Sequence, residues 1–413
     1  MTSSSKLQRR ANDKIRKRWQ LFHATDFESL MYPTFTFCYI LGIFPYKINS
    51  SVFETSTLRY IFSTIITCVY LISLLYIIYV YEISGNGYKI IPRILNRSCF
   101  YILSGFIAII TYILSGPRMR LLQTIKEISS KLPSESYQKL SKLIHTKDLL
   151  GSFFLIIIQL PIYFNVNVPI TTKIFVIYAS QMILHMDMLY MNCVCILKAC
   201  FKGINDNLEN MQEHTMVYHL DKICYKQRSS FLLIELKTLK KQHLMISNTV
   251  QMLNMIFSLQ LLATIIMTFT QITFTLYFYV LYWQINIFVF NIDNIYNYMY
   301  PIFLKMCTIY YFIKLTFVVW ACETGKDQAL QIGITVHDVL NSVDDNEIKR
   351  ELQMFSLQIM HCDNTFSAKG FTVDATLLAS IVGSISTYLL ILMQFLNMTY
   401  CDEKIATNTT HIH

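Results

Sequence analysis

The chain has 413 residues, of which 54% are hydrophobic and 15% are charged, and its mean hydropathy is +0.40. Soluble domains carry about a quarter charged residues, so this composition excludes an ordinary soluble protein and predicts a polytopic membrane protein. The net charge is +9, but Lys and Arg lie between the apolar runs, where they act as topology signals; nucleic acid is not an expected partner. The eleven cysteines show no disulfide framework or zinc spacing, and neither a cofactor nor a metal is expected.

Seven stretches are apolar enough to be membrane spans. They are residues 58–81, 94–115, 149–164, 174–197, a fifth that starts near 252 and stays apolar to 290, 301–320 and 375–395. Residues 29–48 are apolar but broken by Pro33 and Pro45, which predicts an interfacial helix instead of a span. The basic N-terminus and the basic connector at 118–147 are expected in the cytoplasm, so seven spans place the C-terminus outside. The predicted fold is all-α, with this inverted topology.

The polar segment 323–369 predicts cytoplasmic helices with apolar faces. Its first stripe is Ile332, Val336, Leu340 and Val343, and its second is Ile348, Leu352, Phe355 and Ile359. Between them, Asp344-x-x-Glu347 resembles a capping box that opens the second helix. Because each stripe needs a partner, we expect an ordered cytoplasmic bundle.

The last span carries small and polar residues along one helical stripe. They are Ser380, Ser384, Thr387, Ile391 and Gln394, spaced by three and four residues. Two interpretations stay open from periodicity alone. One is close helix packing of the small-xxx-small kind, and the other is a face that touches water in a pore.

Polar side chains inside the other spans are candidates for ligand binding, because such groups are costly in a membrane. The candidates are Gln181 and His185 in the fourth span, Thr268 and Gln271 in the fifth, and Tyr310 and Tyr311 in the sixth. The alternative for each is an interhelical hydrogen bond, and for His185 a buried core histidine.

N-glycosylation sequons give a further indication of the topology. Asn397 and Asn408 follow the last span and agree with an extracellular end, so both are glycosylation candidates. Asn49 belongs to a sequon that the topology places in the cytoplasm, and it is discounted.

The end of the last span resembles a known signature. Thr387-Tyr388, five apolar residues and then Gln394-Phe395 resemble the closing motif of insect gustatory receptors, and Phe366-Ser367-Ala368 with Gly370-Phe371 upstream is similar to that family as well. The resemblance implies a tetrameric ligand-gated cation channel, with a pore lined by the seventh helix at Ser380, Ser384 and Thr387. It also implies that Gln394 and Phe395 form the gate, with Ile391 one turn inward.

The resemblance implies a role for each part of the chain. Residues 1–57 are the cytoplasmic N-terminus and interfacial helix, 58–320 hold six spans with an outward-facing ligand pocket, and 321–371 form cytoplasmic anchor helices. Residues 372–396 are the pore-lining helix, and 397–413 are an extracellular tail. Thr387-Tyr388-Leu389 differs from the Thr-Tyr-Glu of the broad sugar-receptor group and looks closer to the branch of fructose sensors and bitter-related receptors.

The expected protein is therefore a gustatory receptor of the plasma membrane, gated by a small sugar such as fructose or by a bitter compound. Its expected partners are the tastant, membrane lipid and three more copies of itself, or other gustatory receptor subunits in a heteromeric channel. A secondary transporter is the alternative from another class, although no internal repeat or matching pair of helix breaks supports it. An enzyme is not expected, since no phosphate-binding glycine loop and no His-Glu-x-x-His occur.

Overall fold

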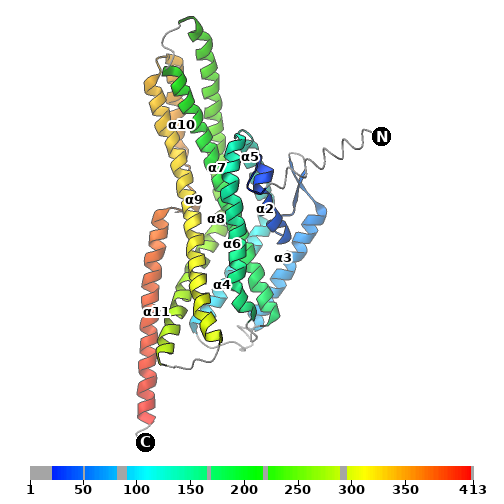
Figure 1. The fold of residues 1–413 in the computed structure, drawn as a ribbon, viewed down its shortest axis with the longest axis vertical. Coiled ribbons are helices and arrows are strands. Elements are labelled where there is room, and N and C mark those ends of the chain that lie inside the picture. The colour runs from blue at the N-terminus through cyan, green and yellow to red at the C-terminus, as the bar shows by residue number, and fades with distance from the viewer. Residues whose placement is uncertain are drawn as a thin grey trace, which may run out of the picture.

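The computed structural model describes residues 21–49, 52–80, 91–164, 169–216, 222–288 and 295–410; side chains are described within 21–47, 52–80, 91–160, 169–212, 230–283 and 301–395. There the chain forms long helices and two short antiparallel hairpins (Figure 1). The helices are α2 (Phe27–Ile40), α3 (Thr57–Ile78), α4 (Ile91–Ile113), α5 (Ser115–Ser129), α6 (Ser134–Phe164), α7 (Ile170–Met216), α8 (Lys222–Phe288), α9 (Ile295–Ser342), α10 (Asn346–His361) and α11 (Ala375–Thr410). The hairpins pair β1 (Tyr46–Asn49) with β2 (Val52–Thr55) and β3 (Ser367–Ala368) with β4 (Phe371–Thr372).

Seven of the described helices are long and apolar enough to cross a membrane: α3, α4, α6, α7, α8, α9 and α11. They coincide with the seven predicted spans, so the prediction of an all-α polytopic membrane protein is confirmed. The helices are longer than the predicted spans, because α6, α7, α8 and α9 continue without a break into the polar connectors. α8 has 67 residues and is about 100 Å long at 1.5 Å per residue, against a hydrocarbon core of ~30 Å.

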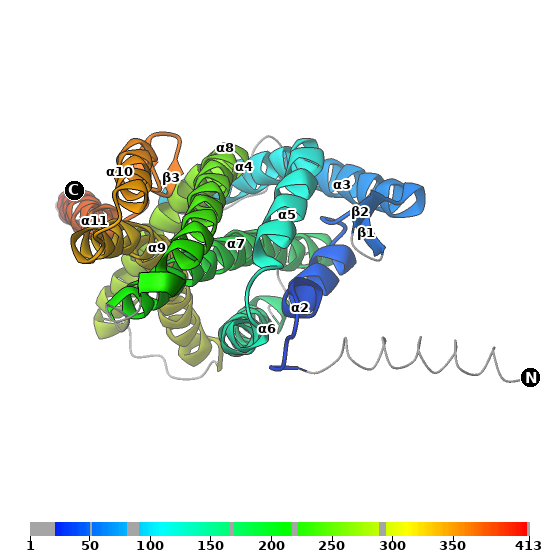
Figure 2. The same ribbon diagram turned by 90° about the horizontal axis from the view of Figure 1, so that it is seen from above.

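The central helix is α7, and α11 lies at the periphery. In the most apolar windows, 89% of the α7 residues are buried but only 11% of those of α11. Figure 2 shows α7 near the middle of the molecule, with α11 and α3 at opposite edges. A helix that is apolar all round must be enclosed by neighbours, and α7 contacts helices α2 to α6, α8 and α9. It is the scaffold on which the rest of the bundle packs.

The extensions of α7, α8 and α9 pack with α10 into a helical bundle beyond the apolar windows (Figure 1). The predicted stripes form its core: Ile332, Val336, Val343, Ile348, Leu352 and Phe355 are buried. At its surface, Lys240 of α8 pairs with Glu351 of α10 at 2.6 Å, and this hydrogen bond holds the pKa of Glu351 below its usual value. The expectation of an ordered bundle between the sixth and seventh spans is thus met.

The predicted cap of α10 is wrong by one residue. Asp345, not Asp344, is the N-cap: its Oδ1 accepts hydrogen bonds from the backbone N–H groups of Glu347 and Ile348 at 2.8 and 3.4 Å. The backbone of Asp345 is extended and the helix begins at the next residue. Two adjacent aspartates offer the same signal in the sequence, and only the backbone turn decides between them.

The short helix α2 is held beside α6 and α7 by a buried polar cluster. Asp148 of α6 is fully buried; its Oδ2 accepts from the Thr34 hydroxyl at 2.5 Å and from the Asn192 amide at 2.9 Å. Its Oδ1 pairs with Lys147 at 2.5 Å. Buried charge of this kind is tolerated only when its oxygens are satisfied. The cluster fixes three helices that are far apart in sequence.

Candidate functional site

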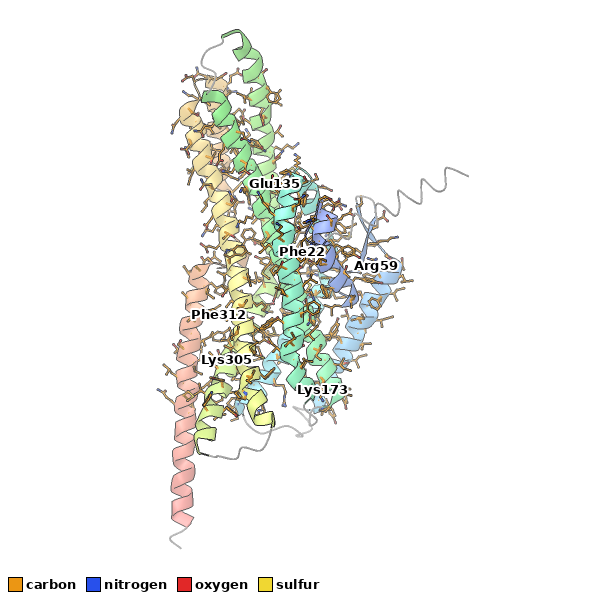
Figure 3. All side chains as sticks on the ribbon, viewed as in Figure 1. Phe22, Arg59, Glu135, Lys173, Lys305 and Phe312 are labelled. Atoms are coloured by element: carbon orange, nitrogen blue, oxygen red, sulfur yellow. The ribbon has the colours of Figure 1, made fainter. Side chains whose placement is uncertain are left out.

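A cavity of about 250 Å³ lies among α4, α6, α7, α8 and α9. It is close to the helix ends remote from the extramembrane bundle, the end marked by Lys173 and Lys305 in Figure 3. Its aromatic lining is Phe100, Tyr101, Phe278, Phe303, Tyr310 and Tyr311. Its polar lining is Asn96, Arg97, Gln159, Ser180, Gln271 and Thr275. Aromatic walls with a few convergent polar groups are typical of small-molecule sites.

The structure places half of the predicted ligand-binding candidates at this cavity. Gln271, Tyr310 and Tyr311 line it. Gln181 and His185 instead face α6 and α2: the Gln181 amide donates to the Ser152 carbonyl at 3.4 Å, and the His185 ring stacks on Phe37 at 4.5 Å. Thr268 is buried on α8 outside the lining.

Two further polar groups of the cavity come from α4 and α6. The Gln271 amide donates to Asn96 Oδ1 at 2.9 Å and so links α8 to α4. Gln159 is 5% exposed, and its Oε1 has no hydrogen-bond partner among the described residues. A buried amide oxygen without a donor is costly, so this atom is a ready acceptor for a hydroxyl or amine of a ligand.

A buried ion pair lies one turn below the cavity. Lys314 of α9 donates to Asp187 Oδ2 of α7 at 3.0 Å, and both side chains are at most 3% exposed. The Lys314 ammonium also lies 5.7 Å from the ring centroid of Tyr311, which lines the cavity. The wall of the cavity is therefore in contact with a charge pair that joins α7 and α9, the two helices with the most extensive contact between them.

One face of α11 packs on its own subunit. Ile381 and Ile385 are buried against Ile272 of α8 and Leu315 of α9. Farther along, Leu389, Leu392 and Met393 pack on a second cluster of α8 and α9. At 100° per residue these side chains share one face of the helix. Among the described residues, the opposite face, which carries Ser380, Ser384, Thr387, Ile391 and Gln394, is exposed.

The predicted pore-lining residues, with Ile391 and Gln394 of the predicted gate, lie opposite the packed face. Ser380, Ser384, Thr387, Ile391 and Gln394 are exposed, and Phe395 is exposed beside the packed face. Ile391 and Phe395 remain 40% and 65% exposed although they are large and apolar. An apolar and polar stripe that is left uncovered on a spanning helix needs lipid, water or another subunit beside it.

The hairpin β3–β4 connects the extramembrane bundle to α11. Lys369 and Gly370 both have positive φ, 51° and 92°, as a two-residue type I′ turn requires. Phe366 before the turn is buried, and a Cβ on Gly325 of α9 would approach its ring to 2.9 Å. Asn254 of α8 exchanges hydrogen bonds of 2.7 and 3.2 Å with the hairpin backbone. The Phe-Ser-Ala and Gly-Phe motifs thus anchor the hairpin to α8 and α9, and we call Phe366 with the β3–β4 hairpin the clamp.

The clamp also sets the start of α11. Asp374 accepts from the backbone N–H of Leu377 at 3.0 Å and from the Thr376 hydroxyl at 2.5 Å, which satisfies the first turn. The N–H of Ala375 donates to Glu323 of α9 at 3.1 Å. α9 consequently touches the cavity, the buried ion pair and the first turn of α11.

Seven candidate spans, five of which surround a ligand-sized cavity, with a helical bundle beyond them, define a multi-pass membrane protein of receptor type. Comparison with known proteins agrees: the family model described as "7tm Chemosensory receptor" matches residues 31–398. The chain belongs to this family. The resemblance found in its last span is thereby confirmed, as are the multi-pass membrane location and the expectation of a receptor instead of an enzyme.

The similar curated proteins are gustatory receptors of Drosophila melanogaster. Gustatory receptor 28b is 34% identical over 113 residues, 25% of this chain and 24% of that protein. Gustatory receptor 28a is 31% identical over 112 residues, 27% of this chain and 25% of that protein. Gustatory receptor 2a is 54% identical over 46 residues, 11% of each chain. The chain thus aligns with about a quarter or less of the length of these relatives.

Similarity to solved structures extends over nearly the whole chain. The insect olfactory receptor OR5 from Machilis hrabei superposes with a TM-score of 0.66 at 13% identity, covering 88% of this chain and 97% of that receptor. Its structure in complex with eugenol also gives a TM-score of 0.66, at 13% identity, covering 89% and 97%. At this identity the likeness establishes a shared fold.

Removing one member of the buried ion pair should destabilise the protein strongly. Asp187→Ala leaves Lys314 as an unpaired buried cation, which costs about 3–5 kcal/mol. Thermal unfolding of the purified protein in detergent measures the loss. The double variant Asp187→Asn with Lys314→Met should recover most of the stability, because no charge is then buried. A control, Asp206→Ala at an exposed site, should be nearly neutral; equal effects of Asp187→Ala and this control would contradict the pairing.

Proposed function

We propose that the chain is a subunit of a tastant-gated, nonselective cation channel whose pore is lined by α11. The observation that carries the proposal is the stripe from Ser380 to Gln394, which points away from its own subunit. The hydroxyls of Ser380 and Thr387 donate hydrogen bonds to backbone carbonyls one turn back, at 2.8 and 3.1 Å. Contact of these two side chains with lipid therefore costs little free energy. Gln394 carries a larger amide, and a water-filled pore is a better environment for it than hydrocarbon.

A single α11 helix cannot enclose a pore, so a channel requires several copies in a ring around a symmetry axis. We propose a homotetramer; a heteromeric channel with other gustatory receptor subunits is the alternative. In such a ring Phe395 and Ile391 would form apolar constrictions, which block ions by excluding water. A small rotation of α11 would bring Gln394 toward the axis and allow water to enter.

The cavity among α4 and α6 to α9 is the proposed ligand site. Its volume of about 250 Å³ suits a small molecule, and its amides and phenols suit hydroxyl-rich or aromatic compounds. A small sugar such as fructose or a bitter compound meets this description. The olfactory receptor of similar fold has been solved with eugenol bound, which supports ligand binding by this architecture.

The proposed route from cavity to pore runs along α9. A ligand against Tyr311 would press on the neighbouring Lys314 and hence on its pair with Asp187. Two turns farther on, Glu323 of the same helix holds the first residue of α11. A shift of α9 along its axis therefore reaches the pore helix through a direct contact.

The orientation is proposed from charge alone: the basic N-terminus and the anchor helices of 321–371 are cytoplasmic, and the end of α11 is extracellular. The cavity of the six-span region 58–320 then opens outward and the pore-lining segment is 372–396. The sequons at Asn397 and Asn408 would be extracellular in the tail 397–413; both side chains lie outside the described residues.

The channel proposal predicts a ligand-evoked cation current in cells that express this chain alone. Whole-cell recording with a panel of sugars and bitter compounds, with G-protein signalling blocked, measures it. Phe395→Ala should raise the basal current several-fold, because it removes the apolar gate. Unchanged basal current in Phe395→Ala, at normal surface expression and with a tastant response in the wild type, would contradict the gate.

The two faces of α11 should differ in water accessibility. Cysteines introduced at Ser384 and Thr387 should react with a charged thiol reagent and reduce the current, since these side chains would line the pore. Cysteines at Ile381 and Ile385, on the packed face of the same helix, should react at least tenfold more slowly. Equal rates at all four positions would refute a pore along this stripe.

A further inference from the structure

A second cavity, of about 300 Å³, lies between α2, the β1–β2 hairpin and the first turn of α3. Its walls include the rings of Tyr32, Phe35, Tyr39 and Phe44 and the cationic side chain of Arg59. Figure 3 places Arg59 at the upper end of α3, whereas Lys173 and Lys305 lie toward the lower end, near the ligand cavity. The two cavities are therefore at opposite ends of the spans.

The acidic groups around this second cavity are already matched by cations. Glu28, in its lining, forms an ion pair with Lys126 of α5 at 2.8 Å. Glu54 of β2 is the register partner of Lys47 of β1, so these two opposite charges lie on the same face of the hairpin, where cross-strand neighbours attract each other. Neither carboxylate is left to balance a further positive charge.

Arg59 supplies that further charge. Its Nη1 donates to the carbonyl oxygen of Tyr46 at 2.6 Å, and its guanidinium lies 4.5 Å from the centroid of the Tyr39 ring. These contacts hold the side chain in place but use neither a carboxylate nor all five N–H donors of the group. The cavity thus presents one positioned, uncompensated positive charge, which matches the single negative charge of a phosphodiester.

An apolar surface begins beside Arg59 and runs along α3. Leu58 is 78% exposed, and the exposed residues that follow on α3 include Ile61, Phe62, Ile65, Val69 and Ile72. The Phe62 ring contacts Tyr39 at the edge of the cavity, with centroids 6.0 Å apart. A ligand that enters the cavity with its charged end therefore has a continuous apolar wall for the remainder of its length.

We propose that this cavity binds an anionic phospholipid, with its phosphodiester on Arg59 and its acyl chains along α3. A free anion would use Arg59 but not the apolar wall, and a neutral lipid would use the wall but leave the charge unbalanced. The bound lipid would join α2, the hairpin and α3 at the membrane surface. This site needs only that α3 spans the membrane, and it stands whether or not α11 lines a pore.

Phosphatidylglycerol titration of the purified full-length protein in neutral detergent tests the site, with the melting temperature as readout. The wild type should show saturable stabilisation, at half-saturating concentrations about tenfold lower for phosphatidylglycerol than for phosphatidylcholine. Arg59→Gln should raise the half-saturating concentration of phosphatidylglycerol by about tenfold. Arg120→Gln is the matched control, an exposed arginine on the neighbouring helix α5 outside the cavity lining, and it should leave the titration unchanged.

Three results would overturn the proposal: equal titrations for Arg59→Gln and Arg120→Gln, equal affinity for the two lipids, or full stabilisation by inorganic phosphate without lipid. The last would show an anion site that makes no use of the apolar wall. If Arg59→Gln does not yield folded protein, Arg59→Lys decides the question. It keeps the charge but not the planar fork, so phosphatidylglycerol should bind it several-fold more weakly, and unchanged affinity would equally overturn the proposal.

Discussion

Hydrocarbon offers no hydrogen-bond partner, and this constraint accounts for most of what the structure shows. The backbone is satisfied inside unbroken helices, and polar side chains within the bundle are gathered where protein groups can meet them. Asp148 with Lys147, and Asp187 with Lys314, are each paired deep among helices. Two exceptions to this rule bear on function: the amide oxygen of Gln159 at the ligand cavity, which has no partner among the described residues, and the exposed stripe of Ser380, Ser384, Thr387 and Gln394 on α11.

The helix α9 ties these places together. The part of α9 remote from the extramembrane bundle forms a wall of the cavity, its middle carries the buried lysine, and its next turns contact both Phe366 and the start of α11. Because protein interiors are close-packed, a displacement of one end of such a helix is transmitted along it. A receptor of the chemosensory family that couples ligand binding to a channel needs a rigid element between the two sites. In this fold the single helix α9 is such an element.

The sequence predicts the helices well because hydropathy and a period of 3.6 residues are local properties. The seven spans and the buried stripes of α9 and α10 all follow from them. The stripe of α11 is visible in the sequence as well, and it lies opposite the face on which Ile381 and Ile385 pack on their own subunit.

The cavity lining could not be predicted in the same way, because it depends on which helices are neighbours. Gln181 and His185 share a face of α7, but that face meets α6 and α2. In the sequence, Arg97 lies near the end of a span and looks like a residue that extends its charged group to the membrane surface. In the structure it lines the cavity together with residues of α8 and α9. The sequence contains these polar groups, and only the three-dimensional arrangement shows which of them converge.

The central claim is that α11 faces other copies of itself around a pore, and a cryo-electron microscopy structure of the purified assembly tests it most directly. The claim predicts a ring of subunits in which Ser384, Thr387 and Gln394 point to the symmetry axis while Ile381 and Ile385 stay packed on α8 and α9. A monomer, or a ring in which this stripe of α11 faces lipid, would contradict it.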